Sequence, residues 1–129
     1  MRTAFKLGGI MVLTLLLVAC ASSTALSRAE QTHQIAFATV DSFLYTEHTD
    51  RALFEIAAPG VHAFAEKMRK QAPAAFEASW KAIEAWEAAK NDQGITATAQ
   101  IYLAVVQSLA DSVRPYLLRW AIAQKEVTP

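Results

Sequence analysis

Residues 61–90 read VHAFAEKMRKQAPAAFEASWKAIEAWEAAK and carry the clearest helical periodicity in the chain. Apolar and small residues recur there in alternating steps of four and three, which places them on one face of a helix. The face consists of Val61, Ala65, Met68, Ala72, Ala75, Ser79, Ala82 and Trp86. Most of these side chains are small, so a neighbouring helix can approach closely. The pattern predicts a helix from about Val61 to Lys90.

A second long helix is predicted on the N-terminal side of this stretch, ending before Pro59-Gly60. Ser27 and Glu30 have the S-x-x-E spacing of a capping box, so we expect the helix to start near Arg28. Glu47 and Arg51 stand four residues apart with the acid first, the favourable order for a helical ion pair. The apolar face of this helix is expected to use Phe37, Val40, Phe43, Leu44, Leu53, Phe54 and Ile56.

A third helix is predicted from about Ile95 to Gln124, after the turn at Asn91–Gly94, where Gly94 is placed to cap the preceding helix. Pro73 and Pro115 fall inside predicted helices and should kink them, because proline lacks the backbone N–H and clashes with the preceding turn. The apolar stripe of the third helix is expected to comprise Ile101, Val105, Leu109, Val113, Tyr116, Leu117 and Trp120.

Three helices of about 30 residues, each about 45 Å long, joined by short turns predict an all-α, up-down-up three-helix bundle. The composition agrees, since the chain has 26 alanines but four glycines and four prolines. Residues 28–129 would form this one domain. From residue 20 onward the chain has 10 Lys and Arg against 12 Asp and Glu, a formal charge of −2. Such a balance argues against nucleic acid as the partner, because phosphate binding needs a concentrated basic patch.

The N-terminal segment has the three parts of a secretory signal. Arg2 and Lys6 precede thirteen uncharged residues, 7–19, and this run is shorter than the roughly 20 apolar residues of a membrane span. It ends in Leu17-Val18-Ala19-Cys20, which resembles the lipobox of bacterial lipoproteins. The resemblance implies that residues 1–19 are a cleaved signal peptide and that Cys20 is lipidated. The alternative is an uncleaved N-terminal anchor.

Lipidation would place the protein on a membrane outside the bacterial cytoplasm. Residues 20–27 would be the lipidated cysteine and a short polar tether. Ala21 is not the Asp that often retains lipoproteins at the inner membrane, so the expected location is the periplasmic face of the outer membrane. In a host without an outer membrane, it is the extracytoplasmic face of the cell membrane. Because Cys20 is the chain's one cysteine, no disulfide could stabilise the mature monomer.

The residues after Cys20 give no pattern typical of catalytic, cofactor-binding or metal-binding sites. The three histidines, His33, His48 and His62, lack metal-ligand spacing, and no glycine-rich phosphate loop is present. The sequence therefore favours a protein that is not an enzyme and has no cofactor. Two residues are candidate partner contacts: His62, beside the turn expected to lie far from the membrane, and Trp86, which would mark a partner surface because it is the tryptophan expected to be exposed if any is.

A second resemblance covers residues 40–90. The pattern Asp41-x-Phe43-Leu44-x-x-Glu47-x-x-x-Arg51, followed by the stretch 67–76, is similar to small helical proteins of phage and prophage genomes whose function is unassigned. It implies a helical bundle of mobile-element origin and gives no functional residues.

Together these patterns predict a membrane-tethered, non-enzymatic binding module. Its expected partner is an envelope or phage-entry protein, as in superinfection exclusion. The alternative is a structural or lysis-associated envelope lipoprotein that self-assembles. The sequence leaves the oligomeric state open.

Overall fold

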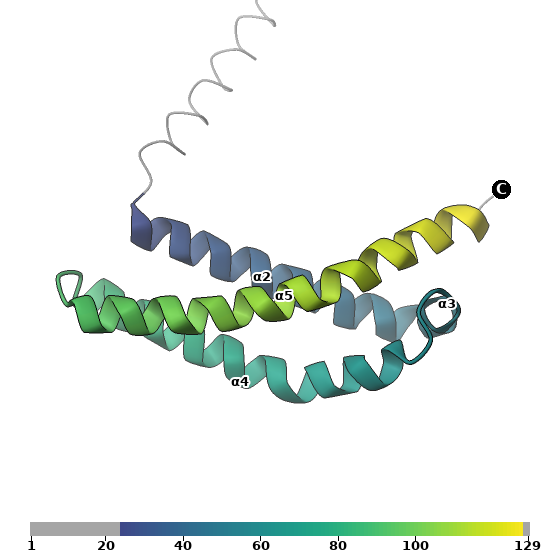
Figure 1. Cartoon of the computed structure of the whole chain (residues 1–129), viewed down its shortest axis with the longest axis horizontal. Coiled ribbons are helices and arrows are strands. Elements are labelled where there is room, and N and C mark those ends of the chain that lie inside the picture. The colour runs from purple at the N-terminus through teal and green to yellow at the C-terminus, as the bar shows by residue number, and fades with distance from the viewer. Residues whose placement is uncertain (1–23, 128–129) are drawn as a thin grey trace, which may run out of the picture.

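The computed structural model describes residues 24–127, and these form four helices packed together, with no strand in that range (Figure 1). The helices are α2 (Ala25–Thr49), α3 (Arg51–Ala57), α4 (Val61–Ala88) and α5 (Gln93–Val127). The all-α prediction is therefore confirmed. The count of three helices is wrong for the described residues, because the first predicted helix is divided into α2 and α3. The Leu17–Cys20 motif lies outside the described residues.

The division between α2 and α3 lies at Asp50, whose backbone leaves helical geometry at φ −131° and ψ 43°. In a continuous helix Phe43 and Phe54 would be about 16 Å apart along the axis. The turn at Asp50 instead brings their ring centroids to 5.9 Å, and both side chains are fully buried. The indole N–H of Trp120 donates to Asp50 Oδ2 at 2.8 Å and holds the corner from α5. The interruption therefore allows α3 to fold back over the end of the core.

Two helix caps differ from the predicted ones. The N-cap of α2 is Thr24, whose hydroxyl accepts from the backbone N–H of Ser27 at 3.1 Å, so α2 begins three residues before the expected Arg28. Gly94 lies in the first turn of α5 and does not cap α4. Asp92 caps α5 instead, since its Oδ1 accepts from the N–H groups of Gly94 and Ile95 at 2.9 and 3.1 Å.

The small-residue face of α4 is confirmed as a core face. Six of its eight predicted members are buried, and Ala75 and Ala82 are half-buried against the core. Because so many of these side chains are alanine, α2 and α5 pack closely on α4.

The predicted apolar faces of the other helices are partly wrong. Phe37 and Ile56 are 52% and 78% exposed, and Ile101 and Val105 are 65% and 45% exposed. The large apolar residues of α5 suggested a stripe that is rotated away from its true core face in the first half of the helix. That face is built around small side chains and consists of Ala99, Leu103, Val106, Ala110 and Val113.

Both internal prolines lie within helices that continue without a break. Figure 1 shows α4 bowed through its middle and α5 turning upward over its last third. Pro73 deprives the carbonyl of Arg69 of its helical donor, and Pro115 does the same for Asp111, which accounts for bending at these places. In the described part of the chain, no helix is long and apolar enough to cross a membrane.

The corner formed by α3 gives a direct stability prediction for the chain from Ser22 onward. Replacing Phe54, which packs on Phe43 and stacks on Trp120 at 5.9 Å, with alanine should lower the free energy of unfolding by about 3–5 kcal/mol. The matched control is Ile56→Ala in the same helix, which should change it by less than about 0.5 kcal/mol because Ile56 is exposed. Urea denaturation followed by circular dichroism measures both. If Phe54→Ala and Ile56→Ala lowered the free energy of unfolding equally, α3 would not be packed as described.

Candidate functional site

The most unusual feature of the core is a buried carboxylate at the junction of α2, α3 and α4. The side chain of Glu47 has no solvent exposure. Its Oε1 accepts from Arg51 Nε of α3 at 3.3 Å and from His62 Nδ1 of α4 at 2.6 Å. Its Oε2 accepts from Arg69 Nη2 at 2.5 Å. Three donors from two helices therefore converge on one α2 carboxylate, which a buried charge requires.

Arg69 joins further groups to this cluster. Its Nη2 also donates to the backbone carbonyl of Leu44 at 3.0 Å, and its Nη1 donates to Glu66 Oε1 at 2.5 Å. The predicted pairing of Glu47 with Arg51 is confirmed, although it now spans the corner between α2 and α3. Glu66 is therefore a second acidic partner of Arg69.

The start of α4 is fixed by a second carboxylate beside the cluster. Glu55 of α3 accepts from the backbone N–H of Gly60 at 3.1 Å and of His62 at 3.0 Å. These N–H groups have no partner within the helix, so Glu55 supplies the cap that Gly60 cannot. Gly60 has φ +84°, a conformation that favours glycine, and it allows the sharp turn from α3 into α4.

The electrostatics of the cluster favour an ionised Glu47. Burial alone would raise the pKa of Glu47, but hydrogen bonds from Arg69 and His62, and the charges of Arg69 and Arg51, outweigh it and leave the pKa below its ordinary value. Hydrogen bonds from the backbone of His62 and Gly60 likewise lower the pKa of Glu55. The cluster thus stabilises the folded protein when Glu47 is ionised.

A second buried polar pair joins α2 to α4. His33 Nδ1 hydrogen-bonds with Ser79 Oγ at 3.0 Å, and both residues are buried. The imidazole lies edge-on to Phe76 and tilted against Trp80, at centroid distances of 5.5 and 5.3 Å. Burial lowers the pKa of His33, so its neutral form is favoured. Since Ser79 has no solvent exposure, the pair can link helices but cannot present a nucleophile to a substrate.

The two residues proposed from sequence as partner contacts have different positions. His62 is 39% exposed at its side chain, so one edge of its ring remains accessible while Nδ1 donates to Glu47. The expectation that Trp86 is exposed is wrong, because it is 5% exposed and belongs to the core. Trp80 is the more exposed tryptophan of the two, at 39%. The reason for assigning Trp86 to a partner surface is therefore lost.

The spacing predicts the pairing of Glu47 with Arg51 but not the burial of Glu47. The signal was its phase: it follows Ala36, Val40 and Phe43 in steps of three and four. A charged residue in the core phase of a helix requires partners on neighbouring helices. No group of three His, Cys, Asp or Glu within residues 24–127 is arranged to hold a metal ion.

Two surface pockets flank α2 on opposite sides. The pocket between α2 and α4 has a volume of ≈160 Å³ and is mostly apolar. Its lining comprises Phe37, Val40, Asp41, Leu44, Ala72, Pro73 and Phe76. The half-exposed ring of Phe37 stands at this pocket and packs edge-on against Phe76 at 5.4 Å.

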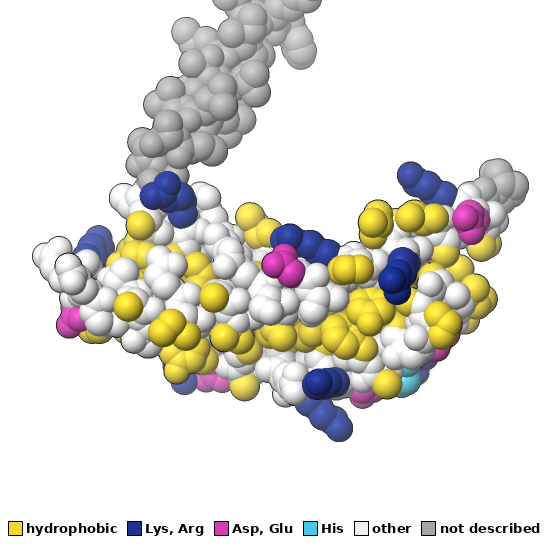
Figure 2. Space-filling view, viewed as in Figure 1, with side chains coloured by type: hydrophobic (Ala, Val, Ile, Leu, Met, Phe, Trp, Pro, Cys, Tyr) yellow, Lys and Arg dark blue, Asp and Glu magenta, His cyan; other side chains and the backbone are white. Residues whose placement is uncertain are grey.

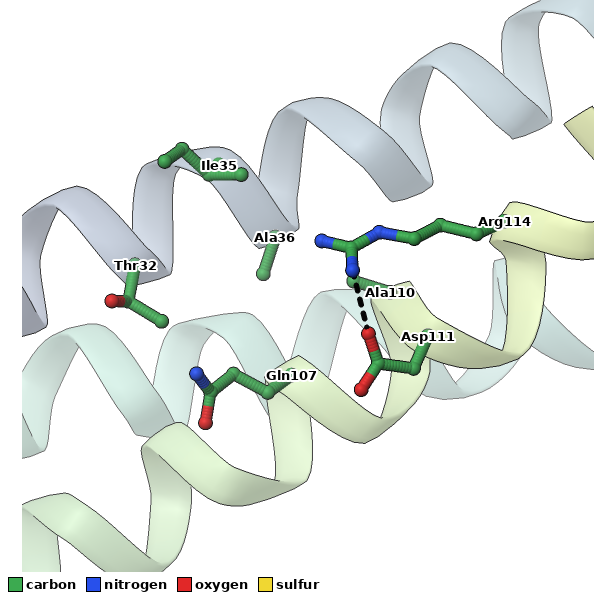
Figure 3. Close-up of a pocket in the computed structure, with 7 residues that line it drawn as sticks. All are labelled: Thr32, Ile35, Ala36, Gln107, Ala110, Asp111 and Arg114. Atoms are coloured by element: carbon green, nitrogen blue, oxygen red, sulfur yellow. Dashed lines mark hydrogen bonds and ion pairs between the residues drawn. The ribbon is translucent and has the colours of Figure 1, made fainter.

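The pocket between α2 and α5 is larger, at ≈310 Å³, and more polar (Figure 3). Thr32, Ile35 and Ala36 lie on its α2 side, and the guanidinium of Arg114 reaches across from α5 while pairing with Asp111 at 2.9 Å. Figure 2 shows the upper edge of the molecule hollowed between the start of α2 and the end of α5. Cationic and acidic side chains lie in this hollow, with apolar side chains beside it.

Comparison with protein-family models, curated proteins and solved structures gave no match to this chain.

The cluster predicts a large effect of Glu47→Gln on stability. The change removes the buried anion that Arg69 and His62 share, and because these two partners are partly exposed the cost should be about 1.5–3 kcal/mol, the contribution of a hydrogen bond to a charged group. The matched control is Glu84→Gln on the exposed side of α4, which should be neutral within about 0.5 kcal/mol. Chemical denaturation at pH 7 measures both variants. A neutral Glu47→Gln would show that the junction does not depend on the charge.

The same prediction has a pH signature. Because the pKa of Glu47 is lower in the folded than in the unfolded state, its contribution is complete above the ordinary glutamate value of about 4.3 and is lost as the pH falls through the folded pKa. Wild-type stability should therefore fall in acid more steeply than that of Glu47→Gln. Parallel pH profiles would contradict the assignment.

Proposed function

We propose that this protein is a lipid-anchored, non-enzymatic interaction module of the bacterial envelope. The Leu17–Cys20 motif supports cleavage before Cys20 and its lipidation. We place the anchor on the periplasmic face of the outer membrane, or on the extracytoplasmic face of the cell membrane in a host without an outer membrane. The three long helices serve as an up-down-up bundle, with α3 forming its corner.

The observation that carries the binding function is the apolar pocket between α2 and α4. Its volume of ≈160 Å³ suits one large apolar side chain, and the partly exposed rings of Phe37 and Trp80 extend the apolar surface around it. Asp41 gives the pocket an acidic lining residue. A partner protein that presents an apolar side chain beside a Lys or Arg fits this combination best.

His62 lies on the same α2-facing side of α4, because its ring contacts Glu47. It is eleven residues before Pro73, about 16 Å along the helix axis. A partner that fills the pocket and extends toward the α3 corner would reach the exposed edge of His62. This retains His62 as a contact residue and replaces Trp86 with Trp80.

The partner class we propose is an envelope or phage-entry protein. The resemblance of residues 40–90 to phage and prophage proteins supports a role in superinfection exclusion, in which a tethered module occupies an entry protein. Self-assembly through exposed apolar residues is the structural alternative.

Lipidation is tested by labelling cells with radioactive palmitate. Wild-type protein should incorporate the label, and Cys20→Ala should remain as an unlabelled precursor of higher mass, because the chain has no other cysteine. Wild-type protein without label would contradict the anchor.

The binding surface is tested by placing a photoreactive phenylalanine analogue at Phe37 in cells. We expect an adduct with an envelope protein that is lost when Asp41→Lys reverses the charge in the pocket. The matched control is Asp111→Lys, an exposed α5 acid in the opposite pocket, which should leave the adduct intact. An adduct with the mass of two copies would favour self-assembly. An adduct insensitive to Asp41→Lys would contradict the pocket as the binding site.

A further inference from the structure

The face of the bundle around the α2–α5 pocket combines cations with exposed aliphatic side chains. On α2, Arg28 and Ile35 lie on this side, seven residues apart and therefore aligned along the helix. On α5, steps of three and four from Asp111 continue the pocket side toward the C-terminus. This face, the α2–α5 face, comprises Arg28, Thr32, Ile35, Asp111, Arg114, Leu118, Ile122 and Lys125.

The aliphatic members of the α2–α5 face have no partner among the described residues that covers them. Ile35, Leu118 and Ile122 are 60%, 63% and 51% exposed. The three cations are exposed as well, and the single acid of the face, Asp111, is already paired with Arg114. The face therefore has a net positive charge and several aliphatic side chains, although the chain as a whole is nearly neutral.

The position of this face relative to the proposed anchor is constrained by chain length. Ala25 is the first residue of α2 and lies five residues after Cys20, a distance that covalent geometry limits to about 18 Å. The spacer is shorter than the tether expected from sequence, because α2 begins at Ala25. Arg28 is in the first turn of the helix, so this end of the face must lie close to the lipid headgroups.

We propose that the α2–α5 face rests on the anionic headgroups of the membrane that carries the Cys20 anchor, with the bundle lying on its side. This inference rests on the proposed lipidation. Ile35, Leu118 and Ile122 enter the interfacial region, and the three cations contact lipid phosphates. Because the anchor already holds the domain at the membrane, each of these contacts forms within one tethered molecule and need not be strong.

The other two sides of the bundle fit this role less well. The α4–α5 side exposes Ile101, Tyr102 and Val105, but this stretch of α5 has no Lys or Arg before Arg114, so any cations on this side come from α4 alone. The α2–α4 side contains Phe37 with the acid Asp41, which anionic lipids would repel. With the α2–α5 face on the membrane, the α2–α4 pocket remains available to a protein partner.

The proposal is tested by spin labels on the lipidated full-length protein in vesicles of phosphatidylethanolamine and phosphatidylglycerol. Ile35→Cys and Ile122→Cys report on the proposed face, and Ile101→Cys and Tyr45→Cys are matched controls, since all four positions are at least half exposed. Lipidated Cys20 is not available to the label. Labels on the α2–α5 face should collide more with lipid-dissolved oxygen than with an aqueous nickel complex. Labels at the controls should show the opposite order.

Charge dependence gives the second arm. Arg28→Gln should lower the ratio of face-down to lifted protein about fivefold, because one cation near an anionic surface contributes roughly that factor to the equilibrium constant. Replacing phosphatidylglycerol with phosphatidylcholine should act in the same direction. Lys81→Gln, a change on α4 away from this face, should leave the oxygen accessibility of Ile35→Cys unchanged.

The outcomes separate the face from the anchor. One outcome is that the protein incorporates palmitate but oxygen collisions are stronger at Ile101→Cys or Tyr45→Cys, or at no position. This result contradicts membrane contact by the α2–α5 face and leaves the lipid anchor supported. If the protein incorporates no palmitate but binds the vesicles with the expected pattern of oxygen collisions, membrane contact by the α2–α5 face is supported and the lipid anchor is contradicted. If the protein incorporates no palmitate and does not bind the vesicles, both the membrane contact of the face and the lipid anchor are contradicted. Insensitivity to both Arg28→Gln and the lipid exchange overturns the role of charge in the proposal.

Discussion

The ionised carboxylate of Glu47 is the constraint on which the α2–α3–α4 junction depends. A charge without solvent exposure is tolerated only when its lone pairs are satisfied, and here Arg51, His62 and Arg69 must all be in place to do so. Their simultaneous placement fixes where α2 stops, how α3 turns and where α4 begins. Replacing the whole cluster of Glu47, Arg69 and His62 with well-packed apolar residues would give comparable stability, but it would not specify one arrangement of the corner so narrowly.

The alanine-rich core determines where the large apolar side chains of the protein lie. Small side chains on the facing sides of α2, α4 and α5 bring the helices close together and leave little room for bulk between them. Large apolar residues such as Phe37, Ile101 and Leu118 are then displaced to the rims of the helix contacts, where they remain exposed. The exposed apolar surface of this protein is therefore a consequence of close helix packing. The proposed binding surfaces use these exposed apolar side chains.

The sequence was sufficient for the fold class, for the turn at Pro59-Gly60, for the existence of a second turn, which lies at residues 89–92, and for the core face of α4, because periodicity and turn chemistry are local signals. It was not sufficient for the corner at Asp50. That break depends on Phe54 packing against Phe43 and on the hydrogen bond from Trp120, seventy residues away in sequence. Non-local contacts of this kind leave no periodic signal.

The same reasoning explains why the candidate site was only partly found. His62 was noted for its place beside a turn, and the structure adds its contact with Glu47, which gives the residue one buried and one exposed edge. Trp86 is buried even though Trp80 and Ile83 already supply bulk on a nearby face of α4. The bundle accommodates it because its neighbours on the small-residue face of α4, Ser79 and Ala82, are small. Whether a large side chain is buried thus depends on the combined volume of its neighbours on the same helix face, and not on that residue alone.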